Sequence, residues 1–131
     1  MSQQNVDRFR RIYERWYEDR RLGPDLLADD VEWVNPPDAV EPGVRKGRDS
    51  FNEAIQSVFA AWDEVRFETE RIIDTGDDVV ALGHVRGRGR AAGIEVARDH
   101  GEIWTFRNGK VIRLRRFHSQ PETLAAAGLG D

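Results

Sequence analysis

Cysteine is missing from the sequence altogether. Its absence excludes disulfide bonds, thiolate metal sites and thiol nucleophiles, and it agrees with a reducing compartment. The chain also lacks an apolar run long enough to span a bilayer, and residues 1–11 contain no apolar stretch of the kind found in secretory signals. We therefore expect a cytoplasmic protein that makes no contact with membranes.

Lysine is nearly missing too, since Lys46 and Lys110 are the only two and arginine carries the remaining positive charge. The 20 basic residues are outnumbered by 24 acidic ones, so the basic excess of a nucleic-acid-binding protein is absent. A hydrophobic content of 39% and a nearly balanced charge are typical of a folded domain. With 131 residues the chain can bury one core, and we predict a single domain over residues 1–131 without nucleic-acid partners.

Apolar residues recur three and four positions apart in two stretches, which is the pattern of an amphipathic helix. The first stretch covers residues 6–21 and the second covers residues 48–62. Two short helices are also predicted: one over LLADD at 26–30, after a glycine and proline stop, and one over 121–128, where proline suits the first turn.

Five stretches have the β-branched and aromatic content of strands: 31–35, 64–74, 78–90, 94–107 and 110–119. Short turns rich in glycine, aspartate and asparagine join the last four, which predicts consecutive antiparallel hairpins. Segment 36–47 predicts a loop long enough to form a lid or the rim of a pocket. The order of elements predicts an α+β fold, with the sheet bending most easily at the strand glycines 83, 87 and 89.

This order of elements, together with ADDVEWVNP, KGRDSFNEAI and IWTFRNGKVIRLRRF, resembles the SnoaL-like branch of the nuclear-transport-factor-2-like superfamily. Ketosteroid isomerases, limonene epoxide hydrolases, polyketide cyclases and proteins without known chemistry belong to that superfamily. The resemblance implies a cone-shaped barrel, in which a strongly curved, mostly antiparallel sheet wraps a pocket closed by three N-terminal helices, with a short C-terminal helix. It also implies a homodimer formed through the outer face of the sheet.

The residues at the family's catalytic positions depart from the family pattern. The resemblance places Asn35 where ketosteroid isomerases have their aspartate base, and an amide cannot accept a proton in that role. The Arg-x-Asp of the epoxide hydrolases becomes His84-Val85-Arg86. The aspartate on the last strand, which polyketide cyclases use as acid and base, becomes Arg116. Each of three chemistries therefore loses a carboxylate that transfers protons.

Other positions of the family sites are retained. Glu102 aligns with the second acid of the ketosteroid isomerases, and Tyr13 corresponds to their first-helix tyrosine. Trp33 and Asn35 resemble the aromatic-x-asparagine pattern that positions water in the epoxide hydrolases. The hydrogen-bonding half of such a site is thus expected to survive without its base.

The same alignment turns the even-numbered residues of the last three strands into the pocket. A hairpin across residues 90–93 then sets His84 opposite His100 on one face. For the last hairpin two registers stay open: a plain two-residue turn at Asn108-Gly109 pairs Glu102 with Arg115, whereas a three-residue loop with a bulge at Gly109 pairs it with Arg116. We favour the bulge because the resemblance requires it.

The candidate site has a catalytic part and a binding part. His84 or His100 is the expected base and Glu102 its orienting or acidic partner, because histidine titrates near neutral pH. The expected ligand-binding residues are Tyr13, Trp33, Asn35, Trp62, Arg86, Arg88, Trp104, Arg116 and His118. For each of these a structural role stays open: tryptophans fill cores, strand histidines satisfy local partners, and Glu102 pairs with a neighbouring arginine.

Two functional hypotheses follow. In the first, the pocket binds a small organic molecule, with arginines that favour an anion, and carries out isomerase-like or hydrolase-like proton transfer without a redox cofactor. In the second, the protein is a non-catalytic ligand-binding or dimerisation module whose interior polar residues are structural. Two histidines and a carboxylate can also hold a metal, but facing polar strands commonly offer as much, so we expect no metal and no other cofactor.

Overall fold

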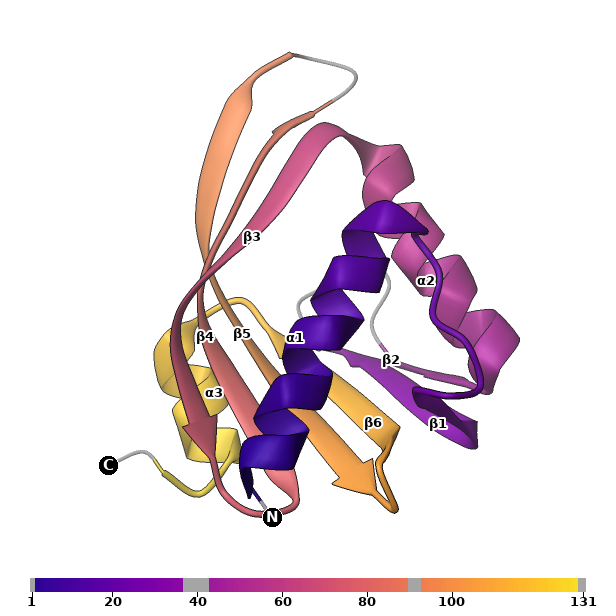
Figure 1. The fold of residues 1–131 in the computed structure, drawn as a ribbon. Helices are drawn as coiled ribbons and strands as arrows, with labels where there is room; N and C mark the ends of the chain where they lie inside the picture. The colour runs from indigo at the N-terminus through magenta and orange to yellow at the C-terminus, as the bar shows by residue number, and fades with distance from the viewer. Residues whose placement is uncertain (1, 37–42, 90–92, 130–131) are drawn as a thin grey trace.

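The computed structural model describes residues 2–36, 43–89 and 93–129, and these form three helices and six strands. In chain order they are α1 (Ser2–Glu18), β1 (Leu27–Asn35), β2 (Gly43–Lys46), α2 (Arg48–Ala61), β3 (Trp62–Asp74), β4 (Asp78–Gly89), β5 (Glu95–Arg107), β6 (Lys110–Phe117) and α3 (Gln120–Ala126) (Figure 1). No helix in the described part of the chain is long and apolar enough to cross a membrane.

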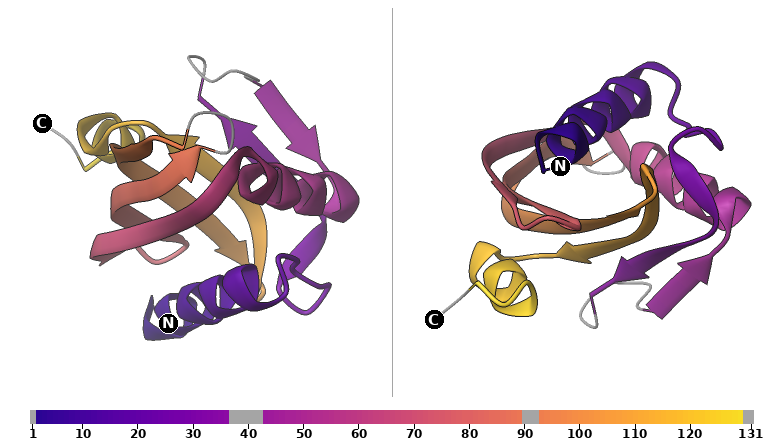
Figure 2. Two further views of the ribbon diagram at one scale, coloured as in Figure 1. Left: turned by 90° about the horizontal axis from the view of Figure 1, so that it is seen from above. Right: turned by 60° about the horizontal axis from the view of Figure 1, so that its bottom comes forward.

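The six strands form one sheet in the order β2-β1-β6-β5-β4-β3. All neighbouring strands are antiparallel except β1 and β6, which are parallel. The sheet curls strongly, with α1 and α2 over its concave side and α3 against its convex side (Figure 2). The α+β prediction is confirmed, with a curved sheet whose two edge strands do not pair to close a barrel.

The helices form where the apolar spacing predicts them. The stripe of α1 buries Phe9, Ile12 and Trp16, and α2 buries Phe51 and Ile55 against the same core. Trp16 also stacks on Trp33 of β1, with ring centroids 5.9 Å apart and planes 16° from parallel. The aromatic interior therefore ties α1 to the sheet.

The short helix predicted over residues 26–30 does not form, because its residues are used by the sheet. Leu27 already belongs to β1 and pairs with Val111. Before this segment, the backbone of Leu22 is held by the buried side chain of Asn52 through two hydrogen bonds of 2.8 and 2.9 Å. Segment 36–47 was predicted as a loop, but residues 43–46 form β2 against β1. The rest of that segment, 37–42, lies outside the described residues, as does the turn at 90–92.

The register between β4 and β5 differs by one residue from the prediction. Gly83, not His84, lies opposite His100, and Ala81 lies opposite Glu102. A shift of one residue turns every side chain of a strand to the other face. The odd-numbered residues of β4 therefore face the core, and its even-numbered residues face outward.

The last hairpin has the register required by the resemblance, although its turn differs from the one we expected. Arg107 pairs with Lys110 across a two-residue turn in which Asn108 and Gly109 have φ of 53° and 80°. A bulge follows, because Thr105 pairs with Arg113 while Phe106 pairs with Val111. This extra residue on β6 sets Glu102 opposite Arg116.

Gly83 allows the edge strand β3 to approach β4 closely. A β-carbon at Gly83 would lie 1.9 Å from the backbone oxygen of Glu68, whereas one at Gly89, on the same strand, would meet nothing within 4 Å. Only glycine fits the first position without moving backbone.

We predict that Gly83→Ala destabilises the protein by about 2 kcal/mol, since the clash must be relieved by backbone movement. Gly89→Ala is the matched control, and it should be neutral or stabilise by about 0.5 kcal/mol because alanine restricts the unfolded chain. Urea unfolding of both variants measures the difference. Equal losses for the two variants would contradict the role of close approach at Gly83.

Candidate functional site

The carboxylate of Glu102 lies at the centre of the inner face, and its side chain is 2% exposed. One carboxylate oxygen, Oε1, accepts hydrogen bonds from the hydroxyl of Tyr13 on α1 and from Nε1 of Trp104 at 3.0 Å. The other, Oε2, lies 3.2 Å from Nε2 of His100 and 3.5 Å from Nε of Arg116. Four donor groups from three elements thus converge on one buried acid.

These contacts decide the ionisation of the cluster. Burial by itself raises the pKa of Glu102, but the contacts with His100, Arg116 and Tyr13 outweigh burial and lower this pKa to about 2. Burial lowers the pKa of His100 and raises that of Tyr13 well above its usual value. At neutral pH the cluster therefore contains an ionised glutamate, a neutral histidine, a neutral tyrosine and the arginine cation.

Arg116 is held by aromatic rings as well as by Glu102. Its guanidinium carbon lies 5.0 Å from the ring centre of Trp33 and 5.3 Å from that of Phe67. The side chain is 14% exposed, so most of it is packed against these neighbours. Packing of this kind fixes the direction of the guanidinium group.

Asn35, on the neighbouring strand β1, is also held by Trp33. Its Oδ1 accepts a hydrogen bond of 2.8 Å from Nε1 of Trp33, which is itself buried. Because Val34 pairs with Arg115, the next residues along, Asn35 and Arg116, lie side by side on parallel strands.

A cavity of about 160 Å³ opens beside this cluster. Apolar and polar side chains both line it, and they are Asn35, Pro36, Val58, Trp62, Phe67, Val85, Arg98, Asp99, His100, Arg116 and His118. A dry cavity of roughly 150 Å³ is known to hold benzene, so the space suits a molecule with a single ring.

Most of the predicted binding residues are brought together by the structure. Asn35, Trp62, Arg116 and His118 line the cavity, as does His100 of the predicted catalytic group. Tyr13, Trp33, Trp104 and Glu102 stand behind this wall and hold it through the hydrogen bonds and ring contacts described above.

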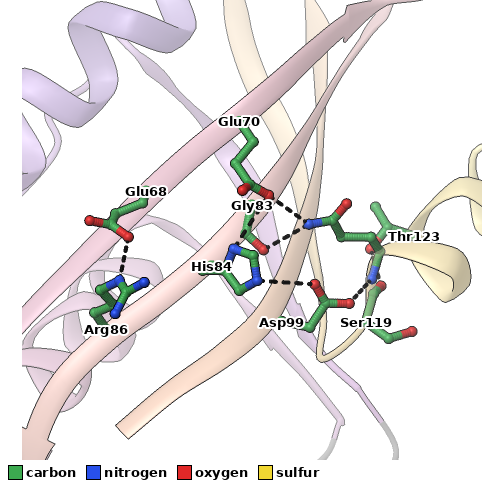
Figure 3. A network of polar contacts seen from close by, with 9 residues as sticks. Glu68, Glu70, Gly83, His84, Arg86, Asp99, Ser119 and Thr123 are labelled. Carbon is green, nitrogen blue, oxygen red and sulfur yellow. Dashed lines mark hydrogen bonds and ion pairs between the residues drawn. The ribbon is translucent and has the colours of Figure 1, made fainter. Parts of the chain in front are cut away.

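His84 is placed elsewhere, on the outer face of the sheet (Figure 3). Its Nδ1 lies 3.3 Å from Oε1 of Glu70, and its Nε2 lies 4.0 Å from Oδ1 of Asp99. Gln120, the first residue of α3, joins this network by donating its backbone N–H to Asp99 at 2.6 Å. The prediction that His84 faces His100 is therefore wrong, and its cause is the one-residue difference in register.

Arg86 and Arg88 are displaced from the cavity for the same reason. Nε of Arg86 donates to Oε1 of Glu68 at 2.6 Å, and Nη2 of Arg88 lies 3.9 Å from Oε2 of Glu64 (Figure 3 for the first pair). Both pairs are cross-strand contacts with β3 on the outer face. The described residues that line the cavity include neither arginine.

Phe67 was not among the predicted site residues, yet it packs against Arg116 and against the ring of His100 at a centroid distance of 5.3 Å. The available signal was the alternation of Val65 and Phe67 with charged neighbours in β3. Among the described residues, no three histidine or acidic side chains are grouped so that they could hold a metal ion.

A curled sheet with helices over its concave face and a cavity beside a buried polar cluster defines a protein of the NTF2-like class. The model of the SnoaL-like domain matches residues 8–114. The chain therefore belongs to the SnoaL-like family. No curated protein matches the sequence.

Solved structures with the same fold are similar over most of their length. An NTF2-like protein of unknown function from Burkholderia pseudomallei is 25% identical, with a TM-score of 0.78 over 95% of this chain and 97% of that one. A protein from Jannaschia that carries the name of a SnoaL-like polyketide cyclase is 16% identical. Its TM-score is 0.77 over 89% of this chain and 86% of that one. TerC, crystallised with polyporic acid, is 24% identical, with a TM-score of 0.74 over 96% and 97%.

We predict that Glu102→Gln destabilises the protein by about 3 kcal/mol at neutral pH, because it leaves the buried Arg116 without its counter-charge. The lowered pKa means that ionised Glu102 stabilises the fold above its usual pKa of 4.5 and that this contribution is lost as the pH falls towards 2. The difference in unfolding free energy between wild type and variant should therefore become smaller as the pH falls through this range, as measured by urea unfolding.

Glu53→Gln, which changes an exposed glutamate of α2 in the same way, is the control and should leave stability nearly unchanged. A difference in unfolding free energy between wild type and Glu102→Gln that stays constant from pH 6 to the acid limit of folding would show that folding does not shift the pKa of Glu102, and it would contradict the lowered value.

Proposed function

We propose that the protein binds a small, single-ring organic molecule in its cavity and catalyses proton transfer on it, with His100 as the base. The observation that carries this proposal is the contact of 3.2 Å between Nε2 of His100 and the ionised carboxylate of Glu102, in the wall of a cavity. A histidine oriented by a carboxylate is a common arrangement for general base catalysis.

The contact with Glu102 sets the tautomer of His100. A nitrogen that faces an ionised carboxylate carries the hydrogen, because a lone pair there would be repelled. Nδ1 is then the nitrogen with the free electron pair. Since burial lowers the pKa of His100, the ring is neutral and able to accept a proton at neutral pH.

Arg116 supplies the charge that such a reaction requires. Removal of a proton from carbon beside a carbonyl group leaves negative charge on the carbonyl oxygen, and a fixed cation nearby stabilises it. The aromatic rings of Trp33 and Phe67 hold the guanidinium in place before the reaction begins. Glu102 cannot take the proton itself, because its pKa is about 2 and its oxygens already face four donors.

The apolar part of the lining favours a flat apolar body. Val58, Trp62 and Phe67 form this part, and aromatic side chains pack well on ring-shaped ligands. The volume of about 160 Å³ restricts the ring system to about one ring.

A binding module without catalysis is the second candidate, and one observation favours it. Hydrogen bonds from Tyr13 and Trp104 and the charge of Arg116 compensate the buried acid, so the cluster has a structural role that needs no substrate. In this case His100 fixes the shape of the cavity, and ligand binding does not depend on its proton affinity.

The experiment that separates the two candidates follows deuterium incorporation into 2-cyclohexenone in buffered D₂O by NMR. We expect the wild type to exceed the buffer rate and His100→Gln to lose about a hundredfold of this acceleration. His84→Gln is the matched control, because His84 lies on the outer face and should leave the rate unchanged.

Equal rates for wild type and His100→Gln would overturn the catalytic proposal. Exchange at the buffer rate, combined with a ligand-induced rise in melting temperature in a screen of small acids, enones and epoxides, would favour the binding module.

A further inference from the structure

Trp62, the first residue of β3, lies where two hollows of the protein meet. One is the cavity of about 160 Å³ described above. The other is a groove of about 470 Å³, which Tyr17, Val65 and Gly87 line together with charged side chains of β3 and β4. Among the described residues, Trp62 alone belongs to the lining of both hollows.

The cavity and the groove follow one another along the same face of the sheet. Phe67 of β3 and Val85 of β4 line the cavity, and they pair with each other across the two strands. The next pair on this face, Val65 and Gly87, lines the groove. Residues two positions apart on a strand point to the same face, so the groove begins where the cavity ends.

Gly87 determines where the indole ring of Trp62 lies. A β-carbon at Gly87 would lie 2.4 Å from Cε3 and 2.9 Å from Cζ3 of Trp62, so the six-membered part of the indole rests directly on the backbone of β4. A side chain at position 87 would occupy the space that this ring fills. The ring is therefore placed at the boundary between the cavity and the groove by a residue that has no side chain.

Trp62 differs from the other three tryptophans in its burial. Trp16, Trp33 and Trp104 are buried in the hydrophobic core, whereas Trp62 is half-buried and does not belong to the core. We therefore expect the fold to tolerate a smaller side chain at position 62.

We infer that Trp62 is a specificity-determining residue, which separates the cavity from the groove and so limits the ligand to a single ring. The inference rests on the proposed function, because it concerns ligands of the same cavity. It adds the residue that imposes the size limit. With a smaller residue at position 62, molecules with two fused rings should bind as well, with the second ring in the groove beside Tyr17 and Val65.

The test compares two ketones that share a six-membered ring with exchangeable hydrogens beside the carbonyl group. They are 2-cyclohexenone, with one ring, and 1-tetralone, with two fused rings, and NMR titrations of the ¹⁵N-labelled protein give both affinities. We expect the wild type to bind 1-tetralone about tenfold more weakly than 2-cyclohexenone, because the second ring overfills the cavity. Trp62→Ala should bind 1-tetralone about tenfold more tightly than the wild type does, without a gain for 2-cyclohexenone.

Two further variants control for folding and for a general loosening of the structure. Trp62→Phe keeps an aromatic ring at this position but makes it smaller, and it should bind 1-tetralone severalfold more tightly than the wild type. Tyr17→Ala removes an aromatic ring from the groove and leaves the lining of the cavity complete, so it should bring no gain for 1-tetralone. Thermal unfolding shows that each variant is folded at the temperature of the titration.

The outcomes separate this inference from the proposed function. If folded Trp62→Ala and Trp62→Phe gain no affinity for 1-tetralone, or if Tyr17→Ala gains as much, Trp62 does not set the size limit, and the cavity remains the site for 2-cyclohexenone. A wild type that binds both ketones equally well, or neither of them, would also overturn the inference. Deuterium exchange into 2-cyclohexenone that depends on His100 would still support the proposed function in each of these cases. Conversely, a gain for Trp62→Ala without such exchange would support the size limit and contradict catalysis.

Discussion

The interaction on which the structure depends is the burial of the Glu102 carboxylate. An isolated carboxylate in a protein interior costs several kcal/mol, and only close donors of good geometry offset this cost. The hydrogen bonds here come from α1 through Tyr13 and from β5 through Trp104, and the remaining oxygen lies in contact with His100 of β5 and with the guanidinium of Arg116 on β6. The position of the first helix and the register of the last hairpin are therefore both tied to one charge.

The register of that hairpin follows from this constraint. A two-residue turn without the bulge would bring Arg115 opposite Glu102 and leave Arg116 on the outer face. The bulge between the Phe106 and Thr105 pairings moves β6 by one residue and puts Arg116 inside. The cost of a local irregularity is small compared with that of an unpaired buried carboxylate.

The same face of the sheet gains its cavity from the way β3 and β4 pack. Small residues, Ala81 and Gly83, stand opposite Glu102 and His100 on β4. Because Gly83 has no side chain, β3 approaches closely, and Phe67 reaches the rings and charges of His100 and Arg116. Close packing of β3 on β4 thus places an aromatic side chain in the lining of the cavity, against His100 and Arg116.

The sequence predicts much of this arrangement, and its main failure at the candidate site has one identifiable cause. Helix stripes, hairpin turns and the inward face of β5 have clear patterns, and the resemblance to the family supplies the inward direction of Arg116. On β4, however, residues 79–82 are apolar on both faces, because α3 covers the outer side. The alternation of apolar and polar residues then does not show which residues of β4 face inward, and His84 is assigned to the wrong face. The glycines at 83 and 87, crowded by β3, were the available indication that the odd-numbered face is the inner one.

The contacts around Glu102 also explain how the site can lack the carboxylates that the resemblance implies. The resemblance implies an aspartate at the positions of Asn35 and Arg116, where it would be a proton-transferring acid in the cavity itself. Here both positions carry donors, and the remaining acid, Glu102, is withdrawn behind them and held ionised. Its negative charge offsets the cost of burying the guanidinium of Arg116. In the proposed reaction a neutral His100 beside this pair accepts the proton, and the cation of Arg116 stabilises the oxygen anion that forms. In the proposed reaction the roles are the reverse of those that the resemblance implies: the carboxylate orients, and the histidine accepts the proton.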